Sequence, residues 1–314
     1  MKGKRLITQF VAALVALPLT SAAQSVRFVE DWETSIPIHS SLSCVCVDKS
    51  RNVELITTDG LWATLDASGK IIRQTHEDML QGALSVACLL QHRIVVAVPP
   101  GTLHIFSGDH QLLASLPVED GIRAVLSADD ESIRLFAPRG EHLFKDVARK
   151  TGATVSLLGS RSQSLIPRGW VPGDVAVDDE RGLLLFLTHN PETASVWDSS
   201  GKLVLSKLIA SDIRPRDESQ SFDIPGTPMS HDQALGIFPL GGGRYLVNVS
   251  REDIAADRKS MTAELHYQVL DGQLNSIGYA SGDFIGVIHA SDANGGIYSV
   301  NGGRRPRIVK AHLQ

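Results

Sequence analysis

The stretch PGDVAVDDERGLLLFL, residues 172–187, followed by VWDSSGKLVL, residues 196–205, is the clearest copy of a pattern that recurs along this chain. An apolar segment ends in a small polar turn, a second apolar segment follows, and a short connection with glycine or proline leads to more strand-like sequence. The pattern occurs in six units, which begin near Leu42, Leu84, Ala124, Pro172, Leu235 and Phe284. Such a period indicates a repeat architecture built from one small unit.

The apolar runs are rich in Val, Ile, Leu and Phe, and no stretch has the pattern of a long amphipathic helix. We therefore predict an all-β fold, a six-bladed β-propeller of four-stranded antiparallel sheets around a channel. The sixth unit lacks a fourth strand. We expect the strand-like segment Val26–Val29 to supply it, so that an N-terminal strand closes the last blade and protects its edge.

The first 23 residues have the three parts of an export signal. Met1–Arg5 is basic, Leu6–Thr20 is apolar, and Ser21–Ala23 offers small residues for cleavage before Gln24. We predict a signal peptide over residues 1–23 and a single propeller domain over residues 24–314, exported to a periplasmic or extracellular location. An uncleaved membrane anchor is the alternative. After cleavage we expect no membrane span, because no later apolar run is long enough.

The charge of the chain excludes one class of partner. The 314 residues carry a formal charge of −5 at pH 7. Loss of Lys2, Lys4 and Arg5 with the signal leaves 27 basic residues against 35 acidic ones, a charge of −8. A net acidic surface argues against binding to nucleic acid, which requires a basic face.

The three cysteines leave two interpretations open. Cys44 and Cys46 lie two residues apart on one strand-like segment, so they point to one face, and Cys88 lies in the corresponding segment of the next unit. They are either small buried core residues or they form a Cys44–Cys88 or a Cys46–Cys88 bridge, which export would permit. Three cysteines do not make a four-ligand zinc site.

The fourth unit resembles NHL repeats, which belong to the broad group of six-bladed propellers. The residues that carry the resemblance are Pro172, Gly173, Val175–Asp178, Gly182, Asn190 and Val196–Lys202, and Leu65–Lys70 repeats the last part. The resemblance implies the fold and a role as a protein- or ligand-binding scaffold. Related six-bladed rings include lyases and lactone hydrolases, so the fold alone does not choose a function.

Three connections are longer than the rest: Gly159–Gly173, Ala210–Ala234 and Ser250–Thr262. In an up-and-down sheet they open on one face and on one side of the ring, where a rigid frame would present binding residues. The candidates for binding an unknown protein or small-molecule ligand, in these connections and in a neighbouring short one, are Arg168, Trp170, His189, Asn190, Arg214, Arg216, Asp217, His231 and Arg251. A polar insertion without a binding role is the alternative.

No nucleophile elbow, zinc-protease motif or phosphate-binding loop is present, so the sequence favours a scaffold without cofactor over an enzyme. The alternative is a metal-dependent lactone hydrolase or lyase. In that case Asp174 and His289, in the innermost strands of two units, would bind a divalent cation such as Ca²⁺ at the channel mouth. The acidic run at residues 178–180 falls in a hairpin, and we expect it to be a solvated turn.

Overall fold

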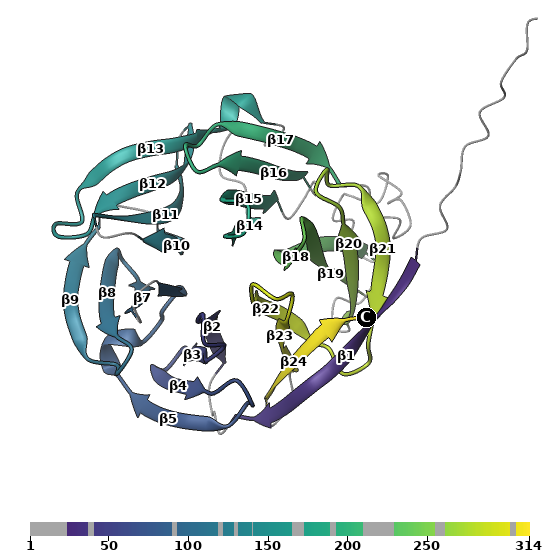
Figure 1. The fold of residues 1–314 in the computed structure, drawn as a ribbon, viewed down its shortest axis with the longest axis horizontal. Helices are drawn as coiled ribbons and strands as arrows, with labels where there is room; N and C mark the ends of the chain where they lie inside the picture. Colours follow the sequence, from purple (N-terminus) through teal and green to yellow (C-terminus); the bar gives the residue numbers. More distant parts are fainter. Residues whose placement is uncertain are drawn as a thin grey trace, which may run out of the picture.

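β-Sheets arranged around a central channel form the part of the chain that the structure describes (Figure 1). The computed structural model describes residues 24–36, 41–89, 93–118, 122–128, 131–139, 141–164, 173–188, 193–209, 229–254, 261–301 and 306–314. Each four-stranded sheet presents its first strand to the channel and its last strand to the outer rim, as in a β-propeller, and the larger sheet described below presents both of its end strands to the channel. The predicted all-β, propeller-like arrangement is confirmed.

Four of the sheets are separate and antiparallel, and each contains four strands in chain order. Sheet 1 consists of β2 (Leu42–Val47), β3 (Val53–Thr57), β4 (Leu61–Leu65) and β5 (Ile71–His76). Sheet 2 consists of β6 (Ser85–Leu89), β7 (Arg93–Val98), β8 (Thr102–Ser107) and β9 (Leu112–Pro117). Sheet 3 consists of β10 (Ala124–Ala128), β11 (Ser132–Arg139), β12 (His142–Ala148) and β13 (Thr154–Ser160). Sheet 4 consists of β14 (Gly173–Asp178), β15 (Leu183–Thr188), β16 (Thr193–Asp198) and β17 (Leu203–Leu208).

The remaining strands form one eight-stranded sheet with the order β18-β19-β20-β21-β1-β24-β23-β22. Its first half is β18 (Met229–Gly241), β19 (Arg244–Ile254), β20 (Met261–Leu270) and β21 (Ser276–Ser281). Its second half is β1 (Gln24–Ser35), β24 (Arg307–Leu313), β23 (Ile297–Asn301) and β22 (Val287–Ser291). Two short 3₁₀ turns, η1 (Asp78–Leu80) and η2 (Arg161–Gln163), lie in connections.

The N-terminal strand joins the two halves of this sheet. Residues 28–35 of β1 pair antiparallel with β24, so the pairing expected of Val26–Val29 with the last unit is confirmed for Phe28 and Val29. Residues 24–27 continue past it and pair parallel with β21. The prediction of six separate sheets is therefore wrong for the last two units, because the twelve-residue β1 is long enough to pair with both. Residues 1–23 lie outside the described residues, and the signal peptide stays a prediction.

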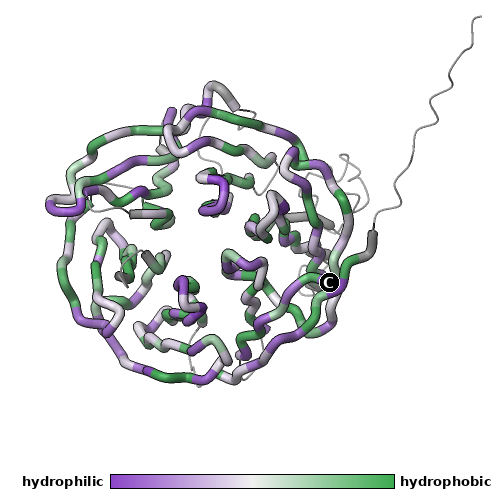
Figure 2. The backbone as a smooth tube through the Cα atoms, viewed as in Figure 1, coloured by the Kyte–Doolittle hydropathy of each residue, from purple (hydrophilic) through white to green (hydrophobic). Residues whose placement is uncertain are grey.

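The core lies between the faces of neighbouring sheets. All five residues of β3 are buried, whereas half-buried and exposed positions alternate in the rim strand β5. Leu185 of β15 and Val247 of β19, for example, belong to one cluster between sheet 4 and the eight-stranded sheet. Strands buried on both faces have continuous apolar runs, and this is why those runs dominate the sequence. Hydrophobic segments occur in every sheet, and many turns are hydrophilic (Figure 2).

One hairpin turn recurs at the rim. The Asp198 carboxylate accepts hydrogen bonds from the backbone N–H groups of Ser200 and Lys202 at 2.9 and 3.0 Å, and Asp66 does the same for Ser68 and Lys70. Gly201 has φ +81°, a conformation that favours glycine. Because the turn requires Asp at its first position and Gly three residues later, it can be predicted from the sequence.

Candidate functional site

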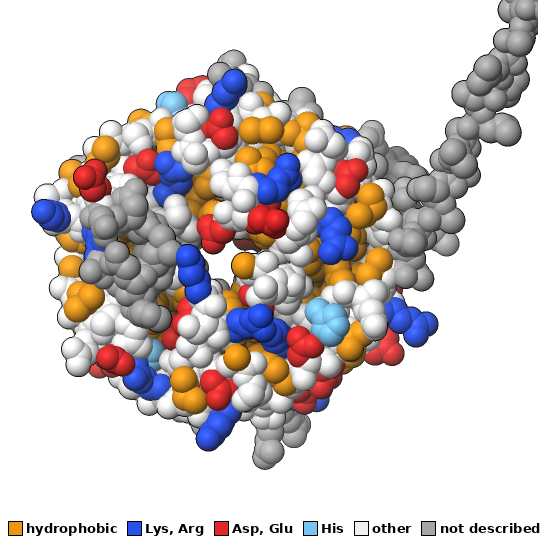
Figure 3. All heavy atoms as spheres, viewed as in Figure 1, with side chains coloured by type: hydrophobic (Ala, Val, Ile, Leu, Met, Phe, Trp, Pro, Cys, Tyr) orange, Lys and Arg blue, Asp and Glu red, His pale blue; other side chains and the backbone are white. Residues whose placement is uncertain are grey.

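The channel contains an open cavity of about 370 Å³ that is lined by the innermost strands β2, β6, β10, β14, β18 and β22. An innermost strand is the edge of its sheet on the channel side, so some of its backbone N–H and C=O groups face the channel and not a second strand. In the space-filling view a narrow hollow lies at the centre of the visible face, with acidic and basic side chains around it (Figure 3). The channel is therefore the concave, polar feature that a ligand could enter.

Polar side chains stand where four of the innermost strands begin. Ser43 and Asp174 are the second residues of β2 and β14, Ser85 is the first residue of β6, and Arg123 directly precedes β10; all four line the cavity. A four-stranded antiparallel sheet returns the chain to its starting side, so every innermost strand begins at the same end of the channel. We call this end the channel mouth.

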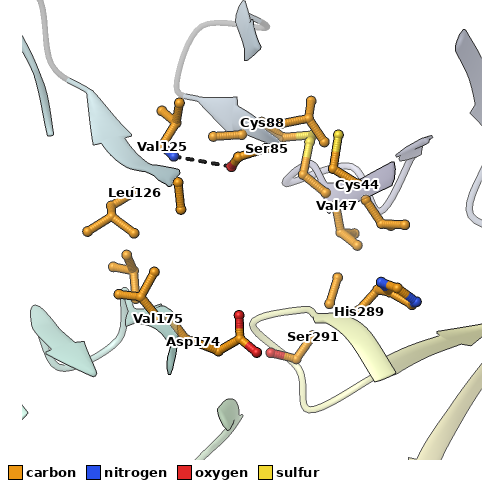
Figure 4. Close-up of a pocket in the computed structure, with 18 of the residues that line it drawn as sticks. Cys44, Val47, Ser85, Cys88, Val125, Leu126, Asp174, Val175, His289 and Ser291 are labelled. Carbon is orange, nitrogen blue, oxygen red and sulfur yellow. Dashed lines mark hydrogen bonds between the residues drawn. A yellow bond between two sulfur atoms is a disulfide. The ribbon is translucent and has the colours of Figure 1, made fainter. Parts of the chain in front are cut away.

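Two hydrogen bonds between sheets hold this end of the channel. The Ser43 hydroxyl donates to the carbonyl oxygen of Ala83. The backbone N–H of Val125 donates to the Ser85 hydroxyl at 3.1 Å, which Figure 4 shows as a dashed line. The bonds connect sheet 1 to sheet 2 and sheet 2 to sheet 3. The two serines are thus positioned by the frame, and a ligand at the mouth would meet hydroxyl oxygens in fixed places.

Asp174 and His289, the candidates for a metal site, both line the cavity. His289 lies at a β-bulge in β22, where the register shifts between Ile288 and Ala290, and a bulge can re-aim a side chain. Burial lowers the pKa of His289, and the negative charge of Asp174 opposes this shift. The carboxylate of Asp174 projects into the opening, whereas the imidazole of His289 lies to one side of it (Figure 4).

No third candidate metal ligand lies with Asp174 and His289 in the described part of the chain. Among the described residues, no three His, Cys, Asp or Glu side chains are grouped closely enough to hold a metal ion. Metal ions in proteins usually take more ligands than one carboxylate and one imidazole can provide. The described ranges also contain no helix that is long and apolar enough to cross a membrane.

Seven of the sequence candidates for ligand binding lie outside the described residues: Arg168, Trp170, His189, Asn190, Arg214, Arg216 and Asp217. The ends of the strands that flank their connections are described. β13, β15 and β17 end, and β14, β16 and β18 begin, at the channel-mouth end of their sheets. The described strand ends that flank these connections therefore lie on the mouth side of the sheets.

His231 and Arg251 lie in strands, so the prediction that both are in loops is wrong. β18 already begins at Met229, β19 continues to Ile254 and β20 begins at Met261, which leaves only residues 255–260 for the connection expected over Ser250–Thr262. The register places Arg251 opposite Asp232 on one side and Glu264 on the other. The apolar periodicity missed this extension because its strands are polar.

Ser43, Ser85 and Arg123 were missed as candidates by sequence reasoning. Each stands close to the start of its innermost strand, directly after the connection from the preceding unit. That position was readable from the repeat. The sequence could not predict that the first residues of these strands lie around one opening, because this arrangement requires closure of the ring.

The structure contains one of the two disulfide bridges that the sequence left open, the one between Cys46 and Cys88. Cys46 of β2 and Cys88 of β6 form a disulfide, and Cys44 is a free, buried thiol. Both bridged residues line the channel, with a Cα–Cα distance of 5.8 Å. The bridge ties the innermost strands of sheets 1 and 2.

Comparison with known proteins supports the fold alone. No protein-family model and no curated protein matches this sequence. A crystal structure of a member of the DUF4221 family from Bacteroides vulgatus ATCC 8482 is similar, with a TM-score of 0.61 and 10% sequence identity. The similarity covers 93% of this chain and 99% of that one. At this identity the chain shares an arrangement of sheets with that protein.

Proposed function

We propose that the chain is an exported, NHL-like six-bladed β-propeller that acts as a non-enzymatic binding scaffold for a protein or a small-molecule ligand. Its binding surface is the channel mouth together with the long connections attached around it, in the fourth and fifth units. The observation that carries the proposal is the convergence of Ser43, Ser85, Arg123 and Asp174 on one end of an open channel.

Packing supports a count of six blades despite the shared sheet. Leu246 of β19 and Ile297 of β23 belong to one apolar cluster, so the two halves of the eight-stranded sheet also pack face to face. Tyr298 of β23 and Leu55 of β3 belong to another, between the second half and sheet 1. The two halves of the eight-stranded sheet thus pack against each other around a core, as neighbouring blades do. Strand β1 adds hydrogen bonds between the two halves at the outer rim.

A thermal-shift screen of the mature protein tests the binding proposal, with a panel of small polar molecules as probes. A ligand that binds only the folded state raises the melting temperature by mass action. We expect a shift with at least one probe, and Asp174→Asn should reduce it. Asp109→Asn, a matched change at an exposed rim turn, should leave the shift unchanged. A shift that both variants retain would place the binding elsewhere.

A metal-dependent lactone hydrolase or lyase is the second candidate, and the electrostatic interaction of Asp174 with His289 is the observation that favours it. The test is the melting temperature in EDTA and in CaCl₂. The scaffold proposal expects the same value in both. A clear rise with Ca²⁺ that His289→Gln abolishes would favour the enzyme.

Export is tested separately by expression of the full chain in a bacterial host. Sequencing of the secreted protein should give a mature N-terminus at Gln24. Retention of Met1 on a membrane-bound product would support the uncleaved anchor.

A further inference from the structure

The Cys46–Cys88 bridge faces the channel. Both cysteines line the open cavity and both are partly exposed, although they belong to the innermost strands of the ring. The bridge lies in view beside the opening (Figure 4). Cys46 also packs against the apolar cluster between sheets 1 and 2, so the bridge lies at the border between that cluster and the channel, where a solute in the channel would meet it.

Cys44 lies two residues from Cys46 at the same apolar cluster, but it is more deeply buried. Its side chain is buried, with 8% of the residue exposed, and it packs with Ile56, Trp62 and Phe106. Burial raises the pKa of the Cys44 thiol to about 12. Since the thiolate is the attacking species in disulfide exchange, this thiol does not reshuffle the bridge at neutral pH.

Hydrogen bonds, ring stacking and apolar packing also hold sheets 1 and 2 together, independently of the disulfide bridge. At the rim, the guanidinium of Arg73 donates to the carbonyl oxygen of Gly108 at 3.0 Å. Deeper, the imidazole of His110 from sheet 2 stacks on Trp62 of sheet 1 at 3.6 Å, and its Nε2 lies 3.2 Å from the Glu54 carboxylate. The apolar cluster around Ile56 and Val96 fills the space between them. Loss of the bridge leaves these contacts in place.

We propose that Cys46–Cys88 is a thiol-exchange site in the channel wall, reduced by small dithiols and re-formed by the corresponding disulfides while the ring stays folded. One thiolate of the dithiol attacks a bridge sulfur, forms a mixed disulfide and releases the other cysteine as a thiolate. The second thiol of the reductant then attacks the mixed disulfide and releases the remaining cysteine. The reductant ends as a disulfide, and Cys46 and Cys88 each take up one proton. The proposal does not depend on the binding function.

The test is alkylation of the mature protein, folded, with and without dithiothreitol, followed by intact mass. We expect no N-ethylmaleimide label without reductant and two labels with it, at Cys46 and Cys88 by peptide mapping. Denaturant should add one label, at Cys44, to both samples. The rate of bridge reduction should rise linearly with dithiothreitol, because reduction does not wait for unfolding.

Variants separate reduction from loss of structure. Cys44→Ser should give the same two labels on reduction and none after denaturation alone. Cys46→Ser/Cys88→Ser should keep a cooperative melting transition and give one label, in denaturant only. Three labels in the folded, reduced protein would overturn the proposal, as would no label, or a reduction rate that does not depend on dithiothreitol concentration.

Discussion

Some of the polar side chains buried between the sheets are hydrogen-bonded, and others are not. The Glu54 carboxylate accepts hydrogen bonds from the Trp62 indole and the Thr64 hydroxyl, both at 2.8 Å. Asn248 is fully buried, and neither the nitrogen nor the oxygen of its amide has a hydrogen-bond partner among the described residues. A buried polar group without a partner loses its bonds to water and gains nothing in exchange. Asn248 should therefore reduce stability, whereas Glu54 should not.

Asn248→Leu should raise the free energy of unfolding by about 1 kcal/mol, because it removes an unsatisfied amide and keeps the volume. The measurement is urea denaturation of the mature protein. Thr57→Val is the matched control at a partnered site, since the Thr57 hydroxyl accepts the N–H of Leu61 at 3.0 Å. It should cost about 1–3 kcal/mol. A loss of stability in Asn248→Leu would mean that the amide has a partner in solution.

His289 should make stability depend on pH. Burial lowers its pKa in the folded state, so the unfolded chain binds the proton more readily. The stabilisation is full above the ordinary histidine pKa of about 6.5 and is lost as pH falls toward the lower folded value. The melting temperature should fall over this window, and the fall should be shallower in His289→Gln. His76→Gln, at a half-exposed side chain, should retain the slope of the parent protein. Equal slopes in all three proteins would contradict the assignment.

Strand β1 is the element that holds the ends of the ring together. Its Phe28 is buried and meets the ring of Tyr267 edge-on, with centroids 5.1 Å apart. The Trp32 indole donates to the carbonyl oxygen of Ala67 in sheet 1 at 3.0 Å. One strand thus contacts three parts of the ring: sheet 1 and both halves of the eight-stranded sheet.

Deletion of residues 25–31 should lower the melting temperature of the whole ring, because it removes the part of β1 that pairs with β21 and with the last residues of β24. The point variant Phe28→Ala should cost about 3–5 kcal/mol through the cavity it leaves. Ile72→Ala, at a rim residue that is 55% exposed, should change stability by less than about 0.5 kcal/mol. An unchanged melting temperature in the deletion would show that β1 is not needed for closure.

Closure of the whole molecule depends on pairing and not on where the chain begins. The backbone N–H of Gln314 donates to the carbonyl oxygen of Arg27 at 3.0 Å, so β24 and β1 run side by side at their ends. Gln24 lies three residues beyond Arg27, a distance of about 10 Å in a strand. A short linker can therefore join Gln314 to Gln24.

A circular permutant with a linker of about six Gly and Ser residues between Gln314 and Gln24, starting at Ser41, should fold. Its β22, β23, β24 and β1 would then follow in chain order, as the strands of sheets 1–4 do. We expect a far-ultraviolet spectrum like that of the mature protein and a melting temperature within a few degrees. The same linker with a new start inside β7, at Val95, should prevent folding, because that strand is buried. Failure of the first permutant alone would contradict closure by strand pairing.

The sequence by itself determined most of the strand content, the repeated unit and the recurring Asp–Gly turn, because alternation, apolar runs and the Asp and Gly offsets are local properties of the chain. It also pointed to the pairing of the N-terminal segment with the last unit, since that unit is one strand short.

Only the tertiary structure decided which side chains meet across sheets. Asp178 was expected in a solvated turn, yet it is buried and accepts a hydrogen bond from the Tyr245 hydroxyl of the neighbouring sheet at 3.1 Å. The tertiary structure also decided three other features. They are the pairing of Cys88 with Cys46 and not with Cys44, the pairing of β1 with β21, and the meeting of polar residues at the channel mouth. Each is set by the relative placement of sheets whose residues are far apart in the chain, and local patterning carries no information on that placement.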